Sequence, residues 1–271
     1  MRRKEPKRLH HTVVDYRTIT VSVAGPVGTL MLDNPAKLNP LSESCLRELI
    51  DAARWFDQRQ DVKAVIVKGN GRAFTAGADL ASFADDESLG RAGADAGRIM
   101  AEAVTNMQAV TIAAIHGHCV GGGVVLASAC DIRIASDDTR FVIPEVALGI
   151  PLAWGGIPRL VREIGPAATR DLVLTCRPFD AAEAQALGFI NRVAPASENN
   201  SELEAAASET AQTLAARPSG TLRATLLAVN AAAEALVATG GAWNDADSLV
   251  AARRDPESRR AAADYLQARR R

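Results

Sequence analysis

The chain has 271 residues, of which 48% are hydrophobic and 23% are charged, and its formal net charge is -1. These values describe a globular protein with one large domain, or a core with a smaller appendage, and they exclude a chain that is disordered as a whole. A charge near zero gives no reason to expect a nucleic-acid partner or a membrane surface, and no apolar run approaches the roughly 20 residues that span a bilayer.

The two ends and the cysteines bear on the compartment. We expect residues 1–11 to form a flexible basic arm, and residues 269–271 to be solvated, because charge runs at chain ends are usually solvated tails. The four cysteines show no CxxC spacing, and no charged-then-apolar leader precedes them. This pattern predicts a reduced, cytoplasmic protein.

The first third of the chain predicts strands and one helix. Residues 18–23 alternate as a strand does, and residues 28–32 form the hairpin partner across a Gly-Pro turn. Ser42 then caps an amphipathic helix whose apolar residues recur at helical spacing. Residues 64–67 are a continuous apolar run, typical of a buried parallel strand, and they lead into a glycine-rich loop at residues 69–79.

The remaining chain changes from mixed elements to helices. Residues 82–97 have weak periodicity and predict a mobile loop before a helix over residues 99–107. Residues 111–131 predict a strand, a glycine turn and a buried helix. Short strands follow at 131–135, 140–143 and 189–193, and helices at 158–164, 167–174, 181–187, 202–216, 221–238 and 255–270. We therefore expect a core over residues 12–195 and a helical region over residues 196–271.

Two glycine-rich loops, each after a strand, are the candidate chemical feature. Glycine lets a ligand approach the main chain, and the first N–H groups of a helix have no acceptor within that helix. Two such donors could polarise one carbonyl, as acyl chemistry through an enolate requires. For the triplet Gly121–Gly123 alone, close packing of a helix on a strand is a slightly favoured alternative.

Five segments, in order, resemble the crotonase family, the enoyl-CoA hydratase and isomerase superfamily. They are NPAKLNPLS at residues 34–42, GRAFTAGAD at 71–79, HGHCVGGG at 116–123 followed by Cys130-Asp131, FVIPE at 141–145, and residues 149–160. The resemblance implies an α/β fold, a crotonase-like ββα spiral core with a C-terminal all-helical oligomerisation segment that builds homotrimers or homohexamers. It also implies an acyl-CoA thioester partner and no separate cofactor, because the substrate carries coenzyme A.

The same resemblance assigns site residues. The backbone N–H groups of Ala78 and Gly122 match the family's oxyanion hole. The positions that match where the family binds the CoA nucleotide and pantetheine are Lys37, Leu38, Arg72, Ala76 and Asp79. A solvated surface is the alternative for the lysine and the arginine.

The acid–base residues decide which reaction the resemblance implies. Hydratases of the family carry two glutamates, and here the second is Glu145 whereas the first matches Val125, which cannot transfer a proton. The extra acid of dienoyl-CoA isomerases matches Ala153. One base remains, which favours isomerisation of a double bond through a thioester enolate. Water addition to a 2-enoyl-CoA, or acyl-CoA binding without catalysis, are the alternatives.

Four residues have a structural alternative to a functional role. Glu145 could be a carboxylate at a helix N-terminus after Pro144, where the helix dipole would lower its pKa, while an apolar pocket would raise it. Trp154 could shape the acyl pocket and limit acyl size, or be a core tryptophan. His116 and His118 have no third ligand in view, so we expect no metal site.

Overall fold

The computed structural model describes residues 12–79 and 90–268, so the predicted arm at residues 1–11 and the basic end at 269–271 lie outside the described residues. The described residues form a seven-stranded sheet with strand order β1-β2-β3-β4-β5-β7-β10. The strands are β1 (Thr12–Asp15), β2 (Ile19–Ala24), β3 (Val27–Leu32), β4 (Ala64–Gly69), β5 (Val110–Ile115), β7 (Ile132–Ser136) and β10 (Arg192–Ala194). β1 to β3 pair antiparallel, and from β3 to β10 the pairing is parallel.

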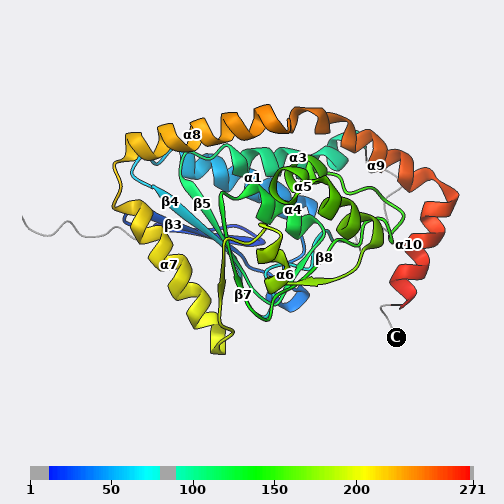
Figure 1. The fold of residues 1–271 in the computed structure, drawn as a ribbon, viewed down its shortest axis with the longest axis horizontal. Coiled ribbons are helices and arrows are strands. Elements are labelled where there is room, and N and C mark those ends of the chain that lie inside the picture. Colours follow the sequence, from blue (N-terminus) through cyan, green and yellow to red (C-terminus); the bar gives the residue numbers. More distant parts are fainter. Residues whose placement is uncertain (1–11, 80–89, 269–271) are drawn as a thin grey trace, which may run out of the picture.

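A smaller sheet holds β6 (His118–Val120), β8 (Arg140–Val142) and β9 (Phe179–Asp180). From β5 to β8, consecutive strands alternate between the two sheets. β5 in the large sheet is followed by β6 in the small one and then by helix α4 (Gly122–Ala129), and β7 is followed by β8 and later by α5 (Gly156–Thr175). This alternation is the predicted spiral of ββα turns (Figure 1).

Local sequence accounts for the elements near the sheet. Exposure alternates along β2 and β3, whereas every residue of β5 is buried, as in a central parallel strand. Helix α1 (Glu43–Asp57) begins where predicted, and the Cys45 N–H donates to Oγ of its N-cap Ser42 at 3.2 Å.

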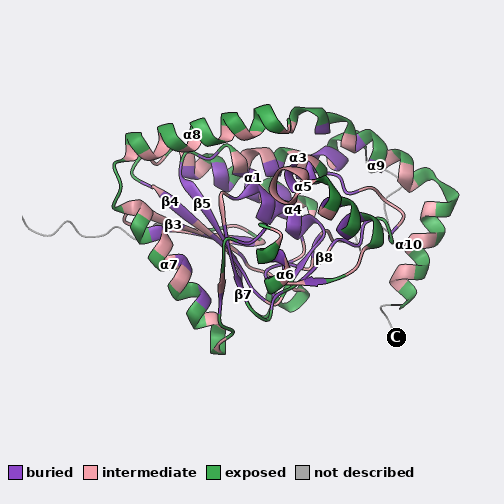
Figure 2. Cartoon of the chain, viewed as in Figure 1, coloured by how far each residue is buried: buried purple, intermediate pink, exposed green. Residues whose placement is uncertain are grey.

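Helices cover both faces of the large sheet, and the strands are buried while the outer helices are exposed (Figure 2). One face packs on α1, α3 (Arg91–Thr105) and α4, and the other on α7 (Ser201–Ala215). Within β5, Ala113 and Ile115 belong to the first core cluster, and Ile112 and Ala114 to the second. The period of two along a strand thus builds two cores.

The C-terminal region is helical, as expected. It comprises η2 (Glu198–Asn200), α7, α8 (Ser219–Leu236), η3 (Gly240–Asn244), α9 (Asp245–Arg254) and α10 (Pro256–Ala268). α9 packs on α3, whereas α8 runs along the outside of the molecule and has no buried residue (Figure 1). Its role in oligomerisation stays a prediction, as does the boundary at residue 195.

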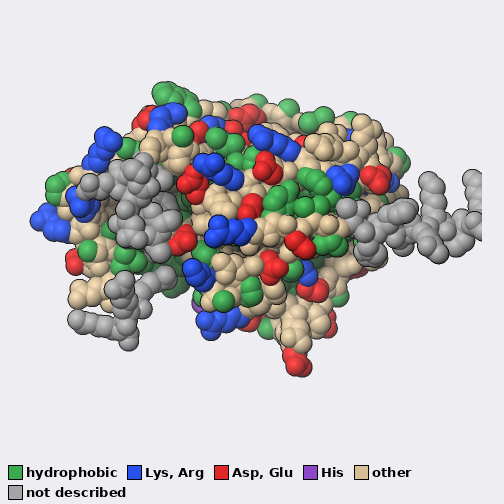
Figure 3. Space-filling model, turned by 180° about the vertical axis from the view of Figure 1, so that it is seen from behind, with side chains coloured by type: hydrophobic (Ala, Val, Ile, Leu, Met, Phe, Trp, Pro, Cys, Tyr) green, Lys and Arg blue, Asp and Glu red, His purple; other side chains and the backbone are tan. Residues whose placement is uncertain are grey.

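Among the described residues, no single helix is long and apolar enough to cross a membrane. One bent pair, Ser219–Leu236 with Gly240–Arg254, passes on length and composition and is bent by 65°. On the face seen in Figure 3, Lys and Arg side chains lie interspersed with Asp and Glu side chains, so that face shows no large field of one sign.

Three sequence expectations are corrected. The helix expected over residues 99–107 begins at Arg91, and only residues 82–89 of the expected loop lie outside the described residues. Ala94, Ala96 and Gly97 are buried along it, and such small contacts give weak hydrophobic periodicity. The last strand begins at Arg192, not at residue 189, because Phe189 is a core residue whose ring packs edge-on against Phe141.

The third correction concerns elements that were not predicted. These are β1, β6, β9, α9 and the short 3-10 turns, including η1 (Pro35–Lys37). The expected helices at 158–164 and 167–174 are confirmed: α5 consists of two helices that meet at a kink, with non-helical backbone at Gly165. α6 (Ala181–Ala186) lies where it was expected.

Candidate active site

The two glycine-rich loops lie side by side, which the sequence could not show. The Thr75 N–H donates to the His118 carbonyl at 3.0 Å, and the Val120 N–H donates to the Thr75 carbonyl at 3.2 Å. A Cβ placed on Gly77 would stand 2.5 Å from the Val120 carbonyl oxygen, and one placed on Gly123 would stand 2.4 Å from Cγ2 of Thr75. Glycine at both positions therefore permits this contact.

The buried side chain of Asn39 joins the two segments that were matched to CoA binding. Its Nδ2 donates to the carbonyls of Asn70 and Ala73, each at 2.9 Å. The main-chain carbonyl of Asn39 accepts from Oγ1 of Thr75 at 2.6 Å. Asn39 has φ of 53°, a left-handed conformation that asparagine tolerates better than most residues. The sequence analysis missed this residue, although an Asn-Pro pair in a loop is a turn signal.

The CoA-matched residues lie on these joined loops. The Ala76 N–H donates to the Leu38 carbonyl at 2.8 Å, so the two segments are adjacent. Lys37 and Arg72 are exposed, and Asp79 is half-buried.

One pocket lies where the glycine loops meet. It has a volume of about 310 Å³, including its open mouth, and it is lined by Ala78, Gly122, Val125, Glu145, Ile150, Pro151, Leu152, Ala153, Trp154 and Leu249. The structure thus brings together the predicted oxyanion, acid–base and pocket residues. Lys37, Leu38, Arg72, Ala76 and Asp79 are not among the lining residues.

Gly121 and Gly122 each make room for a different pocket side chain. A Cβ on Gly121 would stand 2.2 Å from Oε1 of Glu145, and Gly121 also has φ of 48°. A Cβ on Gly122 would stand 2.3 Å from Cζ3 of Trp154. Gly122 is the first residue of α4, so its N–H has no acceptor within the helix. The triplet therefore does more than pack a helix on a strand.

Glu145 is buried in an apolar setting. Only 9% of it is exposed, and Oε2 is buried without a hydrogen-bond partner among the described residues. Burial raises the pKa of this carboxyl from 4.5 to about 7, partly offset by a hydrogen bond from its own backbone N–H. The orphaned oxygen and the raised pKa suit a group that exchanges a proton with a ligand.

The alternative that placed Glu145 at a helix N-terminus is wrong. Residues 145–149 form a hydrogen-bonded turn, in which the Ile150 N–H donates to the Glu145 carbonyl at 3.0 Å. Without a helix after Pro144, no helix dipole lowers this pKa, and burial dominates.

Val125 shares the pocket with Gly122, as expected for residues three apart on one helix. Its side chain is 1% exposed, and a Cβ on Gly156 would stand 2.8 Å from its Cγ2. Ala153, at the position of the other family acid, also lines the pocket. Among the described lining residues, Glu145 alone carries an ionisable side chain.

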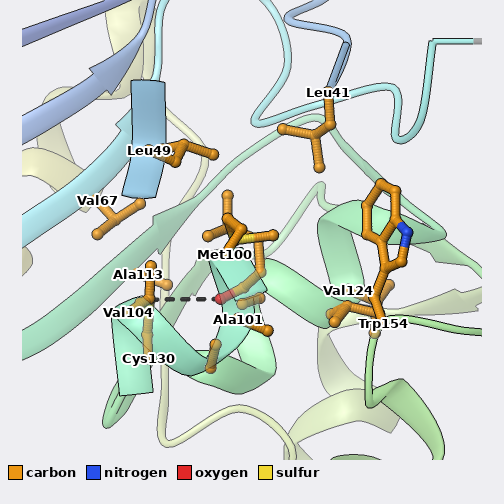
Figure 4. Close-up of a cluster of buried hydrophobic side chains, with 14 of the residues drawn as sticks. Leu41, Leu49, Val67, Met100, Ala101, Val104, Ala113, Val124, Cys130 and Trp154 are labelled. Atoms are coloured by element: carbon orange, nitrogen blue, oxygen red, sulfur yellow. Dashed lines mark hydrogen bonds between the residues drawn. The ribbon is translucent and has the colours of Figure 1, made fainter. Parts of the chain in front are cut away.

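Trp154 lines the pocket and also belongs to the buried core. The two positions that the sequence offered for it, pocket and core, are therefore compatible. It is 7% exposed and stands at the edge of the buried cluster drawn in Figure 4. Its φ of 63° is followed by 68° at Gly155, whose N–H donates to Oδ2 of Asp245 at 2.8 Å. Asp245 and Leu249 come from α9, and the sequence analysis missed both because it predicted no helix there.

The two histidines, His116 and His118, lie in different environments. His118 is exposed, whereas Nε2 of His116 donates to the Gly71 carbonyl at 2.9 Å and so ties the loops together. Burial lowers the pKa of His116. The described residues contain no group of three or more His, Cys, Asp or Glu side chains placed to hold a metal ion.

Known proteins share this architecture. The family model for enoyl-CoA hydratase/isomerase matches residues 23–270. The chain is 38% identical over 229 residues to the probable enoyl-CoA hydratase echA8 of Mycobacterium tuberculosis, covering 83% of this chain and 86% of that protein. It is 36% identical over 198 residues to the peroxisomal Delta(3,5)-Delta(2,4)-dienoyl-CoA isomerase of Arabidopsis thaliana, covering 67% and 71%.

Solved structures of enoyl-CoA hydratases are similar to this chain. An enoyl-CoA hydratase from Bacillus anthracis has a TM-score of 0.72 at 32% identity, covering 81% of this chain and 82% of that one. An enoyl-CoA hydratase from Bacillus halodurans has a TM-score of 0.81, covering 91% and 99%, and at 24% identity it supports the fold alone. With the fold, the paired glycine loops and these matches, the chain belongs to the enoyl-CoA hydratase/isomerase family of the crotonase superfamily and is an enzyme of that family.

Proposed function

We propose that this enzyme moves the carbon–carbon double bond of an enoyl-CoA thioester, with Glu145 as its single acid–base residue. One observation carries the proposal: among the described residues that line the pocket, only Glu145 can take up and return a proton. Isomerisation needs one such group, because the proton removed from one carbon returns to another.

In this proposal the thioester carbonyl accepts hydrogen bonds from the N–H groups of Ala78 and Gly122. Gly122 opens α4, and the positive end of that helix favours the negative charge that develops on the oxygen. Loss of one such donor typically raises the barrier by about 3–4 kcal/mol. The CoA moiety would follow the loops that carry Lys37, Leu38 and Arg72, whose exposed cations suit its phosphates.

The proton would move in two steps. The Glu145 carboxylate removes a proton from C2 of a 3-enoyl-CoA, and the electron pair of that C–H bond delocalises into a dienolate. The carboxylic acid then donates the proton to C4, and the double bond forms between C2 and C3. A pKa of about 7 suits both steps, since a general acid–base works best near the operating pH.

Water addition is the second candidate, because the Mycobacterium and Bacillus relatives are named hydratases. Hydration by two carboxylates has one group act on water while the other acts on the α carbon. Val125 and Ala153, at the positions of the family's additional acids, offer no such group. Acyl-CoA binding without turnover, the third alternative from the sequence, is disfavoured because the chain belongs to a family of enzymes.

An exchange assay in deuterated water separates the three readings. With 3-hexenoyl-CoA we expect conversion to 2-hexenoyl-CoA, and deuterium at C2 or C4 by mass spectrometry. Glu145→Gln should lower this rate by about 10²–10⁴-fold while leaving thioester affinity nearly unchanged. Glu209→Gln, at an exposed glutamate, is the matched control.

The other outcomes point elsewhere. Formation of 3-hydroxyhexanoyl-CoA from 2-hexenoyl-CoA as the faster reaction would favour hydration. Thioester binding with no exchange and no turnover would favour the binding protein. Full activity of Glu145→Gln would assign the base to another group.

A further inference from the structure

The side chain of Trp154 packs between helices α3 and α4, next to Gly122, the candidate oxyanion donor. A Cβ on Gly97 of α3 would stand 2.0 Å from Cδ2 of the indole, and one on Gly122 of α4 would stand 2.3 Å from its Cζ3. The indole therefore rests directly on two bare α carbons. Glycine inside a helix costs about 1 kcal/mol relative to alanine, and here the glycine at position 97 admits the ring.

The backbone that carries Trp154 is held in an uncommon conformation. A bulky residue with positive φ is a genuine outlier that persists only where its surroundings hold it. Here Trp154 and Gly155 are consecutive left-handed residues, and the Gly155 N–H donates to Asp245 of α9. One helical turn later, the same helix places Leu249 in the pocket wall.

The residues around Trp154 in the pocket wall are buried and apolar. Leu152 is 4% exposed, Ala153 is 7% exposed and Leu249 is 2% exposed. The space of about 310 Å³ in this pocket includes open solvent, so the enclosed space is smaller than the roughly 300–1,000 Å³ of typical small-molecule sites. Among the described lining residues, Glu145 alone has an ionisable side chain.

We infer that Trp154, held by Asp245 through Gly155, ends the acyl pocket and restricts this enzyme to short acyl groups such as butanoyl and hexanoyl. The inference rests on the proposed function, because it assigns the apolar wall to the acyl part of a CoA thioester. Trp154 is here a specificity residue: it contacts the acyl group and takes no part in proton transfer.

Binding of saturated thioesters tests the inference without turnover. We would measure Kd by calorimetry for butanoyl-CoA and dodecanoyl-CoA with the full chain. The wild type should prefer butanoyl-CoA by at least about tenfold, a difference of about 1.4 kcal/mol. Trp154→Gly, which suits the positive φ, should bring this ratio to about one or reverse it, and Trp154→Phe should give an intermediate ratio.

Trp243→Ala is the matched control, because Trp243 is 59% exposed in η3, and its ratio should equal that of the wild type. Equal wild-type affinity for the two thioesters would overturn the inference and leave the proposed function standing. An unchanged ratio in folded Trp154→Gly would also overturn it. Absence of binding by both thioesters would refute the proposed function, and this inference with it.

Discussion

The pocket has two sides that are built in different ways. The proposed catalytic side, formed by Ala78, Gly122 and Glu145, is held by loops that directly follow or join strands. The proposed acyl side, formed by Trp154 and Leu249, is held by a left-handed backbone pair and by α9, which lies about a hundred residues further along the chain.

We therefore expect the two sides to control different properties, the rate of proton transfer and the choice of thioester. On the catalytic side, main-chain bonds between adjacent loops set the donors, so a substitution there should change the rate. On the acyl side, side-chain packing and one hydrogen bond set the depth of the pocket. Substitutions there should change which thioester binds while the proton transfer continues.

Among the variants that leave Glu145 in place, the largest effect is expected from Gly121→Ala, on the catalytic side. The new Cβ would stand 2.2 Å from Oε1 of Glu145, at a residue with φ of 48°. We expect the carboxylate to be displaced and the isomerase rate to fall by about 10²–10³-fold, since a 1 Å misplacement can cost about 10²-fold. The assay is the deuterium exchange above, with circular dichroism to verify folding.

Gly165→Ala is the matched control for that variant. Gly165 also has a positive φ, of 74°, but a Cβ there would meet no atom within 4 Å. It therefore carries the backbone strain without the clash and should keep its rate. If both variants lost activity equally, strain rather than displacement of Glu145 would be the cause.

A second prediction concerns the cost of burying Glu145. The pKa of this carboxyl is raised from 4.5 in its ordinary state to about 7 in the fold. The folded state therefore binds the proton more tightly, and the resulting stability is present below pH 4.5 and lost as pH rises to about 7. Glu145→Gln stays neutral, so it should be more stable than the wild type by up to about 3 kcal/mol above pH 7.

Urea unfolding between about pH 5 and pH 8 checks this sign. The excess stability of Glu145→Gln should grow with pH across that range and then level off. The control Glu209→Gln should show no such growth. A difference that shrinks with rising pH would mean that Glu145 is stabilised in its charged form, contrary to its orphaned oxygen.

The two sides also differ in how far the sequence predicts them. Local signals carry the catalytic side: strand-like apolar runs, glycines at turns, and Pro144-Glu145 after a strand. The helical period placed Val125 on the Gly122 face, and the structure confirms that position. These features depend on neighbours along the chain.

The acyl side depends on contacts that local patterns do not contain. Gly97 is buried in a helix that was expected to be a loop, because contacts through small residues leave little hydrophobic period. Asp245 and Leu249 acquire their roles only when α9 reaches the pocket. The assembly of the helical region into trimers or hexamers, and the cytoplasmic location, stay predictions.

The smallest effect is expected from Asp245→Ala, which removes one hydrogen bond from the acyl side but leaves the side chain of Trp154 in place. The Gly155 N–H would lose its acceptor while the indole still rests on Gly97 and Gly122. One hydrogen bond to a charged group contributes about 1.5–3 kcal/mol, and only part of that would reach the pocket. We expect the preference for butanoyl-CoA over dodecanoyl-CoA to fall about threefold, with the exchange rate on a short substrate nearly unchanged.

Asp245→Asn is the matched control, because its amide oxygen can still accept from Gly155. It should keep most of the preference that Asp245→Ala loses. If instead Asp245→Ala lowered the exchange rate and left the preference intact, α9 would support the catalytic side, and the two sides of the pocket would not be separable. A change in preference alone would show that a contact from the helical region tunes substrate size on a core that performs the chemistry by itself.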